Sequence, residues 1–60
     1  MNNDDLVFLV RNAIKNYEET GFGMAKHGKL TVVAKTTNDG MCVAVYESGF
    51  LLQQYIQKSA

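Results

Sequence analysis

Apolar residues recur every three or four positions near the start of the chain, which is the spacing of one face of a helix. The residues on this face are Leu6, Leu9, Val10, Ala13, Ile14 and Tyr17. Asn3 suits the N-cap of such a helix, the two aspartates after it suit the positive end, and Gly21 suits the C-terminal stop. We therefore predict a helix from about Asp4 to Thr20, with Phe8 lying away from its apolar face.

The middle of the chain, Lys29 to Glu47, reads as a β-hairpin: KLTVVAKTT, then NDG, then MCVAVYE. Asp-Gly between runs rich in Val, Thr and Tyr is a strong hairpin signal, because glycine adopts positive φ without a steric clash. Two registers are possible. A three-residue loop, Asn38 to Gly40, would oppose Ala34 to Ala44, and we prefer it because the small pair leaves room for a helix. A two-residue Asp39-Gly40 loop would exchange the faces of one strand.

In the preferred register neither face of the hairpin is polar. An antiparallel hairpin with one wetted side should alternate apolar with charged residues. The supposedly wet side instead carries Val33, Val43 and Val45 beside Lys35 and Glu47. We therefore expect Val33, Val43 and Val45 to lie in an interface between copies of the chain.

The segment before the hairpin, residues 22–26, has two interpretations. His27-Gly28 suits a tight turn, so FGMAK can pair with KLTVV as a short additional strand. The alternative is a loop that packs Phe22 and Met24 over the core. We favour the strand.

The segment after the hairpin also has two interpretations. Ser48 can cap a helix over about residues 50–57, whose apolar stripe would be Leu51, Leu52, Tyr55 and Ile56. Alternatively, Ser48-Gly49 is a turn into a further strand with alternating apolar residues. We favour the helix because leucine and glutamine have high helix propensity.

The predicted fold is therefore a single small α+β domain spanning residues 1–60. Its element order is an N-terminal helix, a two- or three-stranded antiparallel meander and a short C-terminal helix. A chain of sixty residues buries only about 60% of its unfolded surface and needs support from disulfides, a metal or self-association. Cys42 is the only cysteine and suits a buried structural thiol, and His27 is too distant in sequence to join it at a metal site. We therefore expect a homodimer or a larger homo-oligomer.

Charge and hydropathy indicate where in the cell the protein is located and which classes of partner are disfavoured. Six acidic residues balance six basic ones, so no overall field attracts nucleic acid or an anionic membrane. The apolar run LVFLV is too short to span a membrane and lacks the basic start of a secretory signal. We expect a cytoplasmic protein with no membrane partner.

No motif in the chain carries a recognisable catalytic chemistry or a cofactor site. We therefore expect no catalytic, cofactor-binding or metal-binding residues, and a non-catalytic regulator or inhibitor that binds a partner protein. Its size is common among proteins of phages and mobile elements. The candidate contacts are three aromatic anchors and a basic turn: Phe8, Phe50, Tyr55, Lys26, His27 and Lys29.

The alternative function is a nucleic-acid-binding regulator that uses the basic turn Lys26–Lys29 in a dimer. The predicted element order resembles that of double-stranded-RNA-binding domains. However, those domains have a Lys-rich motif at the start of the last helix, and this chain has ESGFLLQQ there. The phosphate contacts that this function needs are therefore missing from that position.

Overall fold

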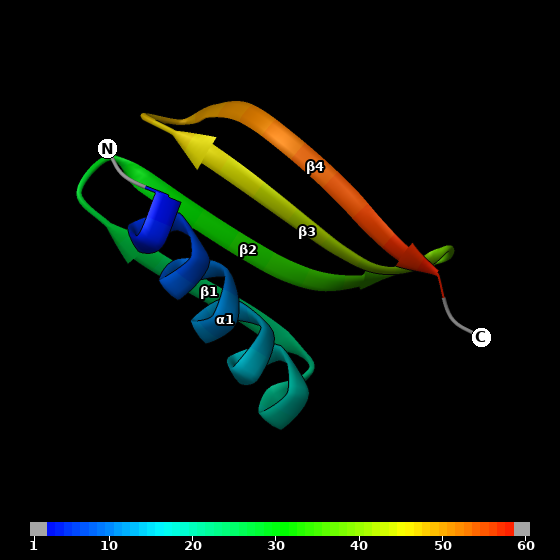
Figure 1. The fold of residues 1–60 in the computed structure, drawn as a ribbon. Coiled ribbons are helices and arrows are strands. Elements are labelled where there is room, and N and C mark those ends of the chain that lie inside the picture. Colours follow the sequence, from blue (N-terminus) through cyan, green and yellow to red (C-terminus); the bar gives the residue numbers. More distant parts are fainter. Residues whose placement is uncertain (1–2, 59–60) are drawn as a thin grey trace.

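The computed structural model describes residues 3–58 as one helix on one antiparallel sheet (Figure 1). The elements are α1 (Asn3–Thr20), β1 (Phe22–His27), β2 (Leu30–Thr37), β3 (Gly40–Glu47) and β4 (Phe50–Lys58). The four strands lie in chain order, and each is antiparallel to the next. The α+β class is therefore confirmed, but the predicted C-terminal helix is wrong because that segment is β4.

Helix α1 uses the apolar face that its sequence predicts. Leu9 and Ala13 are buried in the core, and the other residues of that face pack against it. Gly21 ends the helix with φ +87°, and its N–H donates to the Tyr17 carbonyl over 2.7 Å. The helix begins at Asn3, whose side chain, and with it the predicted N-cap, lies outside the described part of the structure.

The helix lies over the β1 and β2 half of the sheet, side chains of β3 complete the core at its margin, and β4 lies farthest from it (Figure 1). A close approach is possible because Gly23 in β1 has no side chain. A Cβ at Gly23 would overlap the carbonyl oxygen of Ala13 in the helix. The Tyr17 hydroxyl, 2.8 Å from Thr36 Oγ1, links the same half of the helix to β2.

The hairpin of β2 and β3 has neither predicted register. Thr37 pairs with Gly40, so the loop is Asn38-Asp39, and Ala34 faces Val43 instead of Ala44. Gly40 has φ +135°, which favours glycine, and the Thr37 hydroxyl donates to its carbonyl over 2.9 Å. This register is favoured because it brings the larger apolar side chains of both strands to the helix side, where they can be buried.

Because the observed register differs from the predicted one, two of the predicted interface residues lie on the other side of the sheet. Val43 and Val45 point to the helix side and are 0% and 1% exposed, so they form part of the single chain's own core. Val33 points to the opposite side and is half-buried. The three valines therefore do not share a face, contrary to the prediction.

Both outer strands form two-residue hairpins with their neighbours. β1 confirms the strand predicted for residues 22–26, and Gly28-Lys29 turns it into β2. Ser48-Gly49 joins β3 to β4 with φ +52° and +87°, the twist that suits a tight hairpin. At residues 50–57 helix propensity does not decide the structure, because it is a weak preference and pairing with β3 forms a ladder of backbone hydrogen bonds.

The sheet has one side covered in part by α1 and one side that no described element covers. We call the second side the open face. Its larger side chains follow from strand alternation and belong to Phe22, Met24, Lys26, Thr31, Val33, Lys35, Tyr46, Leu51, Gln54, Ile56 and Lys58, around the small residues Cys42 and Ala44.

Candidate functional site

Strand β4 is the most exposed element of the sheet. It pairs with β3 on one side, and no other strand of residues 3–58 lies along its other side (Figure 1). All nine of its residues are exposed. Its large apolar side chains are exposed by 76% at Phe50, 51% at Leu51, 55% at Leu52, 46% at Tyr55 and 43% at Ile56. Such an edge is a template for pairing with another chain.

Alternation of the ladder shows which backbone groups of β4 point outward. A two-residue turn closes on a hydrogen-bonded pair, and hydrogen-bonded pairs then alternate along the strand. Counting from Thr37–Gly40 across β3 places Tyr55 in a hydrogen-bonded pair with Val43. The N–H and C=O groups of Gln54 and Ile56 therefore point away from β3.

The opposite edge of the sheet, along β1, differs from β4 because side chains of α1 form hydrogen bonds to its backbone. There the Asn16 side-chain amide donates to the Met24 carbonyl over 3.3 Å, and the Thr20 hydroxyl donates to the Phe22 carbonyl over 2.8 Å. Side chains of α1 thus occupy two of the outward carbonyls of β1, those of Phe22 and Met24. Covering one edge in this way is a common protection against strand addition, and β4 has no such cover among the described residues.

A bulge divides β4 into two parts. Val45 pairs with Gln53 and Tyr46 with Leu51, so Leu52 is an extra residue without a partner in the ladder. The regular part of the edge therefore runs from Gln53 to Lys58, which is long enough for a short added strand.

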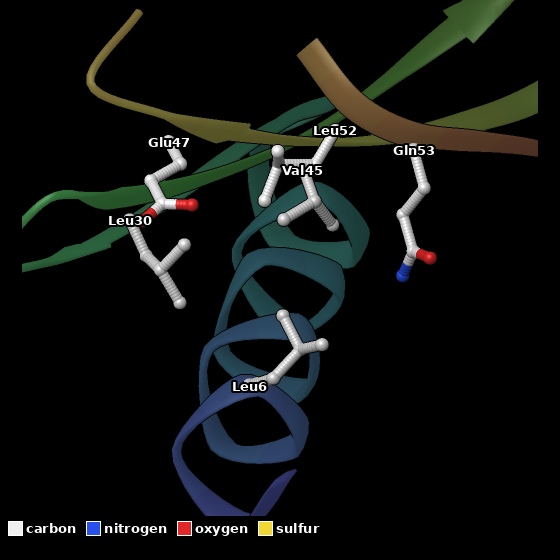
Figure 2. A pocket seen from close by; sticks show the side chains of 6 residues that line it. All are labelled: Leu6, Leu30, Val45, Glu47, Leu52 and Gln53. Carbon is white, nitrogen blue, oxygen red and sulfur yellow. The ribbon is translucent and has the colours of Figure 1, made fainter. Parts of the chain in front are cut away.

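An apolar groove of about 270 Å³ lies between α1 and the start of β4. It is lined by Leu6, Leu30, Val45, Glu47, Leu52 and Gln53 (Figure 2). Leu6 points from the helix toward the sheet, and Leu30, Val45 and Gln53 point back toward the helix. The groove exists because α1 lies over β1 and β2 and does not extend over β4, and it adjoins the exposed edge.

The structure places the predicted contact residues in three places. Phe8, Lys26 and His27 come together along a hollow of about 410 Å³ between α1 and β1, a meeting that the sequence does not indicate. Phe50 and Tyr55 lie on β4. Lys29 lies in the turn between β1 and β2, where its carbonyl accepts from the Ser48 N–H over 2.9 Å.

The edge of β4 corresponds to the strand interpretation of residues 50–57, which was considered from the sequence but not favoured over the helix. Two of its aromatic residues were named, but as part of a helix. The alternation of Phe50, Leu52, Gln54 and Ile56 after a Ser-Gly turn was the signal that could have identified the strand.

Comparison with protein-family models, curated proteins and solved structures found no match. The function of the chain is therefore inferred from its own surface.

The described residues contain few side chains that could take part in catalysis or bind a metal ion. Cys42 is buried, and its sulfur accepts from the Gln54 side-chain amide over 3.3 Å. Among residues 3–58 no three His, Cys, Asp or Glu side chains gather where they could hold a metal ion. The helix in this part of the chain is not long and apolar enough to cross a membrane.

Proposed function

We propose that the protein is a non-catalytic interaction protein that acts as a homo-oligomer, and that its subunits pair along β4. The single observation that carries the proposal is the contrast between the two sheet edges. The outward carbonyls of Phe22 and Met24 in β1 bond to helix side chains, whereas β4 is exposed over all nine residues. A protein that protects one edge and leaves the other exposed has a ready site for strand addition.

The charge of β4 favours a second copy as the added strand. From Phe50 to Gln57 the strand has no charged residue, so an antiparallel pair of copies brings no like charges together. Lys58 follows at the end of the strand, and antiparallel pairing separates the two copies of it. Stacking two open faces is less favourable, because each face presents lysines to the other.

The exposed apolar area of β4 is also of the order that a weak dimer interface needs. Large apolar side chains offer roughly 150 to 250 Å² each, so the five on β4 leave on the order of 500 Å² per chain. Two copies therefore expose on the order of 1,000 Å² of such area, which is below the roughly 1,200 Å² at which specific interfaces begin. The area supports a dimer that dissociates on dilution more than a permanent one.

Pairing along β4 has a geometric consequence for the dimer. Antiparallel strands in one sheet are related by a two-fold axis perpendicular to the sheet, so both helices would lie on one side and both open faces on the other. The partner's β4 would also extend the wall of the groove between Leu6 and Leu52. The regulator or inhibitor role would then use the surfaces that pairing leaves exposed.

Light scattering coupled to size exclusion tests this function. We expect a mass of about twice the 6.7 kDa of one chain at tens of micromolar, falling toward one chain on dilution. A mass of 6.7 kDa at every concentration up to the millimolar range would contradict the proposal.

A further inference from the structure

The charges of the chain are segregated between the two sides of the sheet. The described carboxylate side chains all lie off the open face: Asp4, Asp5, Glu18 and Glu19 on α1, Asp39 in a turn and Glu47 on the helix side. Strand alternation places Lys26, Lys35 and Lys58 on the open face, and Lys26, in the edge strand β1, also lines the hollow between α1 and β1 that Asp5 lines. A chain with zero formal net charge thus presents a sheet face whose charged side chains are all positive.

The same face is apolar between its lysines. Phe22 and Met24 are each 51% exposed, and Ile56 is 43% exposed. Cys42 and Ala44 are buried in the middle of the face because the longer side chains around them cover them. The face therefore combines a shallow apolar centre with separated positive charges.

We propose that the open face binds an acidic segment of a partner protein in which carboxylates alternate with apolar residues. This inference rests on the proposed function as an interaction protein and names the chemistry of its partner. Lysine ammonium groups attract carboxylates, and the aliphatic side chains between them give contact area to the partner's apolar residues.

The register specifies the spacing that such a segment needs. Lys26 pairs with Thr31, and Lys35 pairs with Phe22, so the two lysines are four residues apart along neighbouring strands. That separation is about 13 Å. The pair Met24–Val33 lies midway. An extended segment with carboxylates four residues apart and an apolar residue between them matches this pattern.

A protein segment fits the face better than a single-stranded nucleic acid. Nucleic-acid platforms stack bases on aromatic side chains along a basic groove. Here the residues between the lysines are Met24 and Val33, and the aromatic Phe22 and Tyr46 belong to non-adjacent strands.

Fluorescence anisotropy with a labelled peptide of three Glu-Thr-Leu-Thr repeats tests the inference. In this probe alternate residues form one face of Glu, Leu and Glu. We expect binding that weakens with added salt. The double variant Lys26→Gln/Lys35→Gln should bind about fivefold more weakly, since exposed ion pairs contribute modestly. The matched control Arg11→Gln/Lys15→Gln removes the same charge from the exposed side of α1, and its affinity should change less than about twofold.

Four results would overturn the inference. They are no binding at millimolar peptide, equal binding of a Lys-Thr-Leu-Thr peptide, equal loss in both double variants, and tighter binding of oligo(dT) than of the acidic peptide. Light scattering on the same samples separates this inference from the proposed function. If the protein is assembled but does not bind the peptide, the inference about the open face is refuted and pairing along β4 is not. If the protein is monomeric and binds the peptide, only pairing along β4 is refuted.

Discussion

Gln54→Pro is expected to convert the assembly into monomers without unfolding the chain. Gln54 directs its N–H away from β3, so proline there removes a hydrogen-bond donor from the outer edge but not from the β3–β4 ladder. The pyrrolidine ring also obstructs the incoming strand. We expect the dimer to weaken by about 100-fold, from the loss of the two symmetry-related hydrogen bonds and from the steric block. Sedimentation equilibrium measures the change.

Met24→Pro is the matched control for this experiment. Met24 also lies on the open face and directs its N–H outward, but on the β1 edge, where Asn16 already occupies its carbonyl. We expect Met24→Pro to assemble like the unmodified protein. If both variants dissociate equally, or if neither does, the edge of β4 is not the contact.

Gly23→Ala is expected to cause a large loss of stability by adding a single methyl group between the helix and the sheet. Its Cβ would overlap the Ala13 carbonyl oxygen and press on the backbone at Tyr17. Backbone atoms of a helix cannot move aside singly, so α1 must shift away from β1 and lose packing around Leu9 and Ala13. We expect the free energy of unfolding to fall by about 3 kcal/mol.

Urea denaturation followed by circular dichroism measures this loss. Met24→Ala is the comparison, because Met24 neighbours Gly23 but points to the open face and is half exposed. It should cost less than about 1 kcal/mol. Equal stability of the two variants would show that α1 does not contact β1 as closely as the structure has it.

The elements with local signals were predictable from the sequence. Helix α1 has a 3.6-residue apolar period and Gly21 at its end, and a recognisable turn at His27-Gly28 follows β1. The residue pairing of the hairpin was not predictable, because Asn38-Asp39-Gly40 fits several loops. The choice among them depends on which side chains α1 buries, a long-range effect that local turn chemistry does not contain.

The candidate site was only partly predictable, for a related reason. Residues 50–57 contain leucines and glutamines that suit a helix in isolation, and pairing with β3 overrides that preference. Once the segment is a strand, Phe50 and Tyr55 become part of an exposed edge. The proposed interface therefore lies along β4 and not at Val43 and Val45, which the chain buries in its own core.

Hydrogen exchange at the Gln54 and Ile56 amides tests pairing along β4 most directly. Both N–H groups point outward, so only an added strand can protect them. If the subunits pair along β4, these two amides exchange slowly in the assembled protein and lose that protection on dilution, while the outward amide of Met24 exchanges fast throughout. Exchange at Gln54 and Ile56 as fast as at Met24, under conditions where the protein is assembled, would contradict this pairing.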